Sequence, residues 1–378
     1  MSENERYIVD FEALRGGWWN EGAFRERYRE RSLRERASEC RGDAAQFVRS
    51  DLPEIWRIVE QIRGAEEKKP FDGTVIFAPN GGNNGDFVGQ NGAKVGDNGR
   101  SLGGKTPGAE ERFRVVGQEL GFDLDEVGLC HDIIEVLKSG RAQTIHARIK
   151  PAMPRSADEI VGEIGLRGGY TTYFESNPNR EHNIALAIEK FNGLCVGNGQ
   201  SVSFNGAVGA RSEARGFKEA KIILDGEFVP GIGGGVCQAS TTLFNALLLA
   251  GVTIDESHNH SLAISYVPLG RDAMVSSGTD LRFTNNTGAT IYFETGFTPA
   301  SSNHHGHANR HGSVFVKIYG RQRTVNYRPR VVVGETDGPE GEVSERRAAT
   351  YLDTYKGERL VHTKFIRKSR YNVKRQSA

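Results

Sequence analysis

The sequence contains little cysteine, and its cysteines are far apart. Cys40, Cys130, Cys195 and Cys237 form no C-x-x-C pair, which argues against a thioredoxin-like motif, a zinc knuckle and a disulfide scaffold. An excess of charge is also absent, because 49 lysines and arginines stand against 48 aspartates and glutamates. No overall charge therefore draws the chain to nucleic acid or to an anionic membrane, and we expect no nucleic-acid partner.

Long apolar runs are absent as well. No segment approaches the roughly 18 apolar residues that a membrane helix needs, so we expect no transmembrane segment. Residues 1–36 contain no apolar stretch of the kind found in a secretory signal. The sequence as it stands predicts a cytoplasmic protein, and an extracytoplasmic one only if an export segment has been removed.

Glycine is plentiful, with 47 residues, and part of it lies in a Gly/Asn-rich segment over residues 78–108. This segment cannot sustain a helix. It contains a G-x-x-x-x-G-K-T match at Gly99, Gly104, Lys105 and Thr106. A phosphate loop requires a helix growing directly from the Lys-Thr pair, whereas a proline and a glycine follow here. We therefore expect no nucleotide and no cofactor.

A second polar loop contains His304, His305, His307 and His311. No cysteine or carboxylate completes a ligand set among them, and the loop shows no convincing helical pattern. We expect a solvated loop and no metal.

The chain divides into three predicted regions. Residues 1–69 form a charged helical region, in which glutamates and arginines recur at helical spacing over residues 17–64. Residues 70–165 form an α+β segment that includes the Gly/Asn-rich loop. Within it, residues 109–140 predict a helix, a turn and a second helix, residues 141–151 predict a strand, and Pro151 and Pro154 mark a domain edge.

Residues 166–378 form the third region, for which we expect an α+β domain of mixed helix and antiparallel sheet, preceded by the smaller helical or α+β N-terminal domain. Two helices are predicted, one over residues 179–193 and one following Cys237 and ending at Gly251. Strands are predicted at 261–267, 280–286, 289–297, 313–320, 325–335 and 359–371, with a hairpin turning at the Asn-Asn-Thr-Gly segment between the second and third of these.

The segment GIGGGVCQAS at 231–240 places Cys237 at or within one turn of a helix N-terminus. The helix dipole and free backbone N–H groups there lower the pKa of a thiol and favour the nucleophilic thiolate. Gly234 and Gly235 let the backbone approach a substrate and turn N–H groups toward an oxyanion, and Gln238 offers a side-chain donor. The alternative is a glycine turn into a buried helix that carries an inert cysteine.

A base is available about twenty residues later in the chain. His258 and His260 share one face if their segment is extended, so either imidazole can serve. A thiol and a histidine are the minimum for nucleophilic acyl transfer. Asp272 and Asp280 both remain open as the carboxylate that orients the histidine, and we take Asp272 forward as the candidate.

Residues 170 to 297 resemble the VanW family. The segments YTTYF, NREHNIALAIEKFNG, VSFN, GIGGGVCQASTTLFNA, SHNHSLAISYVPLGRDA and DLRFTNNT fall in the order and at the spacing of that family. The tail through Tyr371 resembles the family's C-terminal strands, and residues 70–165 more weakly resemble a peptidoglycan-binding segment that often precedes this domain. The sequence GNGQ at 197–200 departs from the family pattern, which has an acidic residue there.

The resemblance implies a cell-wall function connected with glycopeptide-antibiotic resistance. Some members of the family are L,D-transpeptidases, in which a cysteine takes an acyl group from a peptidoglycan stem peptide as a thioester and passes it to an amine. By position, Cys237 is then the nucleophile and His260 the base, with Asp272 as the candidate third residue. The residues expected to contact the substrate or the oxyanion are Gly234, Gly235, Gln238, Ser240, Thr241, Arg271 and Asn205.

Two further functions fit the same residues. One is an intracellular enzyme that forms or hydrolyses an amide or ester of a peptide-like metabolite in a biosynthetic pathway. The other is a non-catalytic module that binds cell-wall peptide in the same groove. The reactivity of Cys237 distinguishes catalysis from binding.

Overall fold

The computed structural model describes most of the second half of the chain and parts of the first. The described residues are 69–79, 112–126, 149–175, 177–224, 227–300, 311–337 and 343–373, with shorter pieces at 6–8, 59–60, 63, 87–88, 94–95, 128–129, 132 and 144–146. Most of the helical region predicted over residues 17–64, the G-x-x-x-x-G-K-T match and His304, His305 and His307 lie outside them. Among the described residues, no helix is both long and apolar enough to span a bilayer.

The chain divides into two compact units. Unit 1 contains Met1–Gly73 and Gly117–Ser156, and unit 2 contains Thr74–Val116 and Ala157–Ala378. Residues 74–116 thus group with the C-terminal part of the chain, although the sequence places them in the segment before it. Every candidate site residue belongs to unit 2.

Unit 1 contains short antiparallel strand pairs. Strand β1 (Arg6–Ile8) pairs with β7 (Thr144–His146), and β6 (Gly121–Leu124) pairs with β8 (Ile149–Ala152). In place of the single strand predicted over residues 141–151, the structure has two short strands, β7 and β8, which belong to different sheets.

Unit 2 is built on a four-stranded antiparallel sheet. Its strand order is β10 (Cys195–Val196), β16 (Ile291–Thr298), β17 (His311–Arg321) and β9 (Ile164–Glu175). Along β17, buried and partly exposed residues alternate, as expected for a strand with one face on a core. Val314, Val316 and Ile318 supply its buried face.

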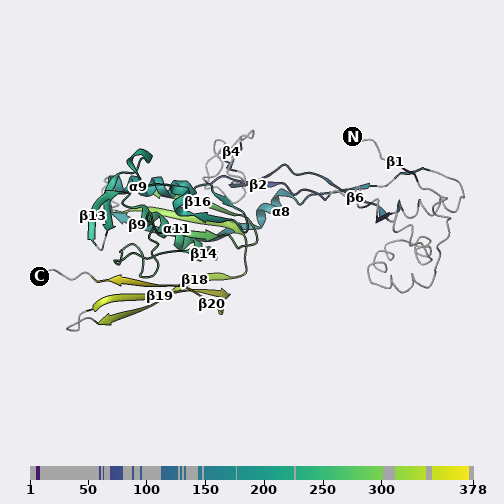
Figure 1. Cartoon of the computed structure of the whole chain (residues 1–378). Helices are drawn as coiled ribbons and strands as arrows, with labels where there is room; N and C mark the ends of the chain where they lie inside the picture. The colour runs from purple at the N-terminus through teal and green to yellow at the C-terminus, as the bar shows by residue number, and fades with distance from the viewer. Residues whose placement is uncertain are drawn as a thin grey trace, which may run out of the picture. The chain divides into compact units, whose positions relative to one another are not determined.

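Two helices pack against this sheet (Figure 1). Helix α9 (Pro178–Ile188) begins with Asn177, whose side chain accepts a hydrogen bond from the Arg180 N–H, and a short 3₁₀ turn (Glu189–Phe191) continues it. Helix α11 (Val236–Ala250) contacts β9 and β17 and also the more C-terminal strand β18 (Asn326–Asp337). It is buried on nearly all sides, which explains why its sequence is apolar beyond a single stripe. Both predicted helices are confirmed, and Gly251 ends α11 with φ 74°.

Smaller sheets surround this core. Strand β11 (Ser201–Ser203) pairs with β15 (Arg282–Thr284), which also pairs with β14 (Thr253–Glu256), and β12 (Glu219–Leu224) pairs with β13 (Glu227–Ile232). Strands β18, β19 (Val343–Lys356) and β20 (Arg359–Asn372) form a separate antiparallel sheet. The remaining elements are β2 (Thr74–Phe77), β3 (Phe87–Val88), β4 (Lys94–Val95), β5 (Phe113–Val116), α8 (Ala157–Gly162), α10 (Phe204–Val208) and a 3₁₀ turn at Glu213–Arg215.

The helix predicted at the start of residues 109–140 is wrong. Strands β5 and β6 occupy residues 113–116 and 121–124. Strand β5 pairs with β2, and Phe113 stacks on Phe77 at 4.9 Å between ring centroids. This non-local pairing overrides the local helical preference of the segment.

Two other predictions are also wrong. Residues 261–267 form no strand, apart from an isolated bridge between Leu262 and Asn372. The segments 280–286 and 289–297 do contain strands, β15 and β16, but these belong to different sheets and form no hairpin. The side chain of Asn285 explains the turn between them, because it donates to the Val196 and Ala289 carbonyls and so directs the chain from one sheet to the other.

The close approach of α11 to β9 depends on Gly168. A Cβ atom at this position would lie 2.4 Å from the Ala250 backbone nitrogen, whereas one at Gly169 would make only ordinary contacts of 3.5 Å or more. We expect Gly168→Ala to lower the free energy of unfolding by about 1–3 kcal/mol through overpacking. Gly169→Ala is the matched control, and equal denaturant midpoints for the two variants would contradict this packing.

Candidate active site

The turn before α11 requires its glycines for conformation and for space. Gly233 and Gly235 have φ values of 87° and 108°, which side-chain-bearing residues rarely adopt. A Cβ at Gly234 would lie 2.7 Å from the Ala220 backbone on β12. The glycines therefore let the chain leave β13, cross β12 closely and start the helix within three residues.

Cys237 is the second residue of α11 and is partly exposed. Its Sγ lies 3.4 Å from the carbonyl oxygen of Val275. Cys195 provides a contrast, because it is buried in β10 and burial raises its pKa to about 12. Cys40 and Cys130 lie outside the described residues.

His260 lies between Cys237 and Asp272. Its Nδ1 is 2.8 Å from the Asp272 Oδ2, and its backbone N–H donates to the same oxygen at 2.7 Å. The imidazole also interacts with the Cys237 side chain, and this interaction affects the pKa values of both groups. Because Nδ1 is engaged by the carboxylate, Nε2 is the ring atom left for the sulfur.

The C-terminal sheet supports Asp272 from the other side. The Tyr371 hydroxyl donates to the Asp272 Oδ1 at 2.6 Å, and the Arg367 Nη2 lies 3.3 Å from the same oxygen. Arg367 also donates to the Asp272 backbone carbonyl. Asp272 is only 1% exposed, so these bonds replace the solvation that it has lost.

The arrangement favours an ion pair between thiolate and imidazolium. Burial opposes ionisation of Cys237, but its interaction with His260, the His260 charge, a backbone hydrogen bond from Val275 and the Arg211 charge outweigh it, so the pKa of the thiol lies below its usual value. Burial likewise opposes protonation of His260, yet its bonds to Asp272 and Cys237 raise its pKa to about 9. Despite burial, the pKa of Asp272 is lowered by its bonds to His260 and Tyr371 and by the Arg367 charge.

The structure separates the two candidate histidines and the two candidate aspartates that the sequence left open. His258 lies 2.9 Å from the Glu256 carboxylate, and its backbone bridges Met274. Asp280 accepts hydrogen bonds from the Ser203 hydroxyl and the Asn205 backbone N–H. The structure therefore brings Cys237, His260 and Asp272 together and places His258 and Asp280 in other contacts.

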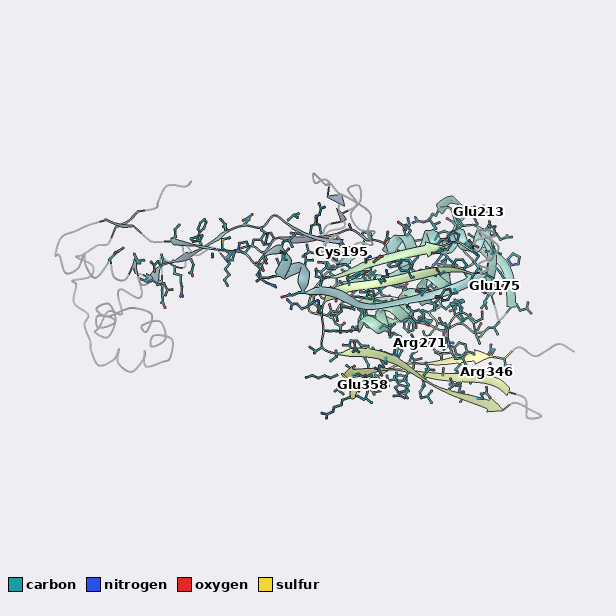
Figure 2. All side chains as sticks on the ribbon, turned by 180° about the vertical axis from the view of Figure 1, so that it is seen from behind. Glu175, Cys195, Glu213, Arg271, Arg346 and Glu358 are labelled. Atoms are coloured by element: carbon teal, nitrogen blue, oxygen red, sulfur yellow. The ribbon has the colours of Figure 1, made fainter. Side chains whose placement is uncertain are left out.

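Ser240, Thr241 and Arg271, expected near the substrate, lie instead along the contact between α11 and residues 271–275. The Ser240 hydroxyl donates to the Ala273 carbonyl at 2.6 Å, and the Thr241 Oγ1 accepts from the Ala273 N–H at 2.9 Å. The Arg271 Nε donates to the Asn245 Oδ1, and its guanidinium covers the Tyr170 ring. Arg271 lies on the side of the main body of unit 2 that faces the β18–β19–β20 sheet, which is also part of this unit (Figure 2). These residues hold the segment 271–275, which contains Asp272, against α11.

Gln238 has a similar structural position. Its amide nitrogen donates to the Thr172 Oγ1 at 3.1 Å and the Tyr173 carbonyl at 2.9 Å, and its oxygen accepts from the Arg180 Nη2 at 2.8 Å. Both amide hydrogens are used within β9, so the side chain is not available as an oxyanion donor in this conformation. It ties the first turn of α11 to β9 and α9.

The backbone offers a better oxyanion donor than Gln238. The N–H groups of Val236 and Gln238 donate to the Gly233 and Gly235 carbonyls. Within the described part of the chain, the intervening N–H of Cys237 has no such acceptor. An unpaired N–H group at a helix N-terminus can stabilise a negative charge beside Cys237. Gly234 and Gly235 shape this turn.

Sequence reasoning missed four residues of the site. Arg367 and Tyr371 lie on β20, more than ninety positions after Asp272, and no local signal connects them to it. Tyr266 lies beside Thr241 and Cys237, and burial followed by the Cys237 charge raises the pKa of its phenol, which therefore stays protonated. Arg211 acts on the thiol through its charge. Among the described residues, no group of histidines, cysteines and carboxylates is arranged to hold a metal ion.

The fold and the site define an α+β protein with a cysteine–histidine–aspartate arrangement at the start of a buried helix. Its family follows from comparison with known proteins. Residues 179–304 match the family model described as VanW like protein, and the chain therefore contains a VanW-family domain.

Two relatives each match about a third of the chain. The chain is 43% identical over 136 residues to the uncharacterized protein YoaR of Bacillus subtilis. This match covers 35% of this chain and 45% of the relative. The chain is 30% identical over 118 residues to the vancomycin B-type resistance protein VanW of Enterococcus faecalis, covering 30% of this chain and 43% of the relative. The matches span less than half the length of either relative, and no solved structure matches the chain.

We expect Cys237 to be the reactive thiol at neutral pH. A lowered pKa keeps a larger thiolate fraction as the pH falls, whereas the raised pKa of Cys195 leaves almost none. Iodoacetamide should therefore modify Cys237 at least about tenfold faster than Cys195. His260→Ala should slow the modification of Cys237 at neutral pH by about tenfold or more. Peptide mapping by mass spectrometry measures both rates, and equal rates at the two cysteines would contradict the ion pair.

We also expect Asp272 to be the main structural support of the site. Asp272→Asn leaves the buried Arg367 without its carboxylate, which should cost about 3–5 kcal/mol of unfolding free energy. Tyr371→Phe removes one hydroxyl and should cost about 1–3 kcal/mol, because the Gly270 N–H that donates to it loses its acceptor. Tyr351→Phe on the same sheet is the matched control. Equal unfolding free energies for all three variants, measured by denaturant unfolding, would exclude this role.

Proposed function

We propose that the protein is a cysteine-dependent acyltransferase, an L,D-transpeptidase acting on peptidoglycan stem peptides. The observation that supports the proposal is the grouping of Cys237, His260 and Asp272, in which His260 hydrogen bonds Asp272 and interacts with the Cys237 thiol. A thiol at a helix N-terminus, paired with an oriented histidine, is the arrangement that nucleophilic acyl transfer requires.

In the first step, the Cys237 thiolate attacks the carbonyl carbon of the donor amide. The carbonyl electrons move to oxygen, and the backbone N–H of Cys237 stabilises the resulting oxyanion. As the tetrahedral intermediate collapses, the C–N bond breaks and His260 gives its Nε2 proton to the departing amine. The acyl group remains on Cys237 as a thioester.

In the second step, an acceptor amine attacks the thioester. The now neutral His260 takes a proton from the attacking nitrogen, and the thiolate leaves as the new amide forms. Asp272 holds the imidazole orientation throughout and stabilises its charged form. No oxidant, reductant or cofactor is needed for this cycle.

The substrate class rests on family membership and on a relative's name. The matched domain belongs to the VanW family, and one relative is named for vancomycin B-type resistance. Resistance to that antibiotic and the transpeptidase activity of some family members both concern cell-wall peptides. A peptidoglycan stem peptide is therefore the donor that we propose.

The direct test is incubation with purified muropeptides followed by intact-protein mass spectrometry. An acyl adduct should appear on the wild type, be absent from Cys237→Ser and persist in Cys195→Ser, the matched control. Because the pKa of His260 is raised to about 9, proton donation to the leaving amine and hence the acylation rate should decline above about that pH. An adduct on Cys237→Ser, or no adduct with any muropeptide, would refute the proposal.

A further inference from the structure

Two arginines pack on the glycine turn that leads to Cys237. A Cβ at Gly233 would lie 2.9 Å from the Cβ of Arg211, and a Cβ at Gly235 would lie 3.0 Å from the Cγ of Arg180. The two side chains come from different elements, the loop after α10 and the first turn of α9. The aliphatic parts of two arginine side chains thus pack on the turn before α11.

Each of these arginines makes one side-chain hydrogen bond to an amide oxygen, and we consider Arg211 further because its charge acts on the Cys237 thiol. Arg180 donates to the Gln238 amide oxygen, which is itself fixed to β9 through the amide nitrogen. Arg211 donates through Nη2 to the Asn205 Oδ1. A guanidinium has five N–H donors, so this bond orients the Arg211 fork and leaves most of it free.

Asn205 is a rigid support for that fork. Its amide nitrogen donates to the Ser276 and Thr279 carbonyls, both at 2.9 Å, and its backbone N–H donates to Asp280 at 2.9 Å. The orientation of the side-chain oxygen toward Arg211 is therefore fixed by three bonds. Such preorganisation reduces the entropy lost when a ligand binds.

The charge of Arg211 is not neutralised by an ion pair within the described residues. Asp280 is the carboxylate whose charge acts on it, but the oxygens of Asp280 already accept from Ser203, Asn205 and Leu281. The charges of Arg211 and Cys237 also act on each other. Arg211 is partly exposed to solvent.

We propose that Arg211 binds the carboxylate of the donor peptide's C-terminal residue, the residue that leaves when Cys237 is acylated. This inference rests on the proposed function and specifies its substrate: a peptide with a free carboxylate next to the amide that is cleaved. In such a peptide a single carbon separates the leaving nitrogen from the carboxylate. A guanidinium beside the turn that positions the nucleophile suits that short separation, because Arg binds carboxylates in a planar, bidentate manner.

The test compares two alkylating reagents that differ in charge. Iodoacetate carries a carboxylate and iodoacetamide its neutral amide, and in both the thiolate displaces iodide from the same carbon. Arg211→Gln changes the ionisation of the Cys237 thiol, and this change affects both reactions equally. The ratio of the two rates at Cys237 therefore isolates carboxylate binding. We expect the iodoacetate-to-iodoacetamide ratio to fall about tenfold in Arg211→Gln, and less in Arg211→Lys, which keeps the charge but loses the fork.

Arg215→Gln is the matched control, because Arg215 is exposed in the 3₁₀ turn that follows Arg211 and, among the described residues, donates to the Val208 carbonyl. Its ratio should equal that of the wild type. A ratio unchanged in Arg211→Gln while both reagents modify Cys237 would overturn the carboxylate site and leave the proposed function standing. Failure of both reagents to modify wild-type Cys237 would overturn both.

A second comparison uses the donor itself. A stem tetrapeptide with a free C-terminal carboxylate should acylate wild-type Cys237 at least about tenfold faster than the same peptide with a C-terminal carboxamide. In Arg211→Gln the two peptides should react at similar rates. A wild-type enzyme that acylates equally with both would contradict the role of Arg211, although it would support acyl transfer.

Discussion

The buried hydrogen bond between Asp272 and His260 is the interaction on which the rest of the site depends. It fixes the imidazole ring, leaves Nε2 for Cys237 and favours the charged form of the histidine. A carboxylate that is 1% exposed is tolerated only because Tyr371 and Arg367 on β20 also bond to it. The C-terminal sheet is therefore part of the site, even though its residues lie far from the cysteine in the chain.

The second constraint is the burial of α11. A helix covered by β9, β17 and β18 cannot shift without disturbing the core of unit 2. Cys237 lies in the first turn of this helix and is partly exposed, and the polar side chains of Ser240, Thr241 and Asn245 connect successive turns to residues 271–275. Cys237 and residues 271–275, which include Asp272, are thus fixed to the same rigid element.

The sequence predicted the centre of this site more accurately than its surroundings. Helical periodicity and the glycine turn predicted that Cys237 lies at the start of a helix, and the family resemblance selected His260. Both predictions depend on local sequence signals. Local signals did not predict that β15 and β16 enter different sheets, or that residues 261–267 avoid a strand, because both outcomes depend on partners distant in sequence. Gln238, Ser240 and Thr241 lie beside the nucleophile in sequence, yet their polar groups are used to join elements. Arg367 and Tyr371 had no local signal at all.

The most direct test of the account is the ionisation of Cys237 itself, followed through the ultraviolet absorbance of the thiolate as the pH is varied. The difference between wild type and Cys237→Ser should show a thiolate already present at neutral pH, and Asp272→Asn should shift its appearance to higher pH. A thiolate that forms only near the ordinary cysteine pKa of about 8.5, in the wild type and in Asp272→Asn alike, would contradict the central claim.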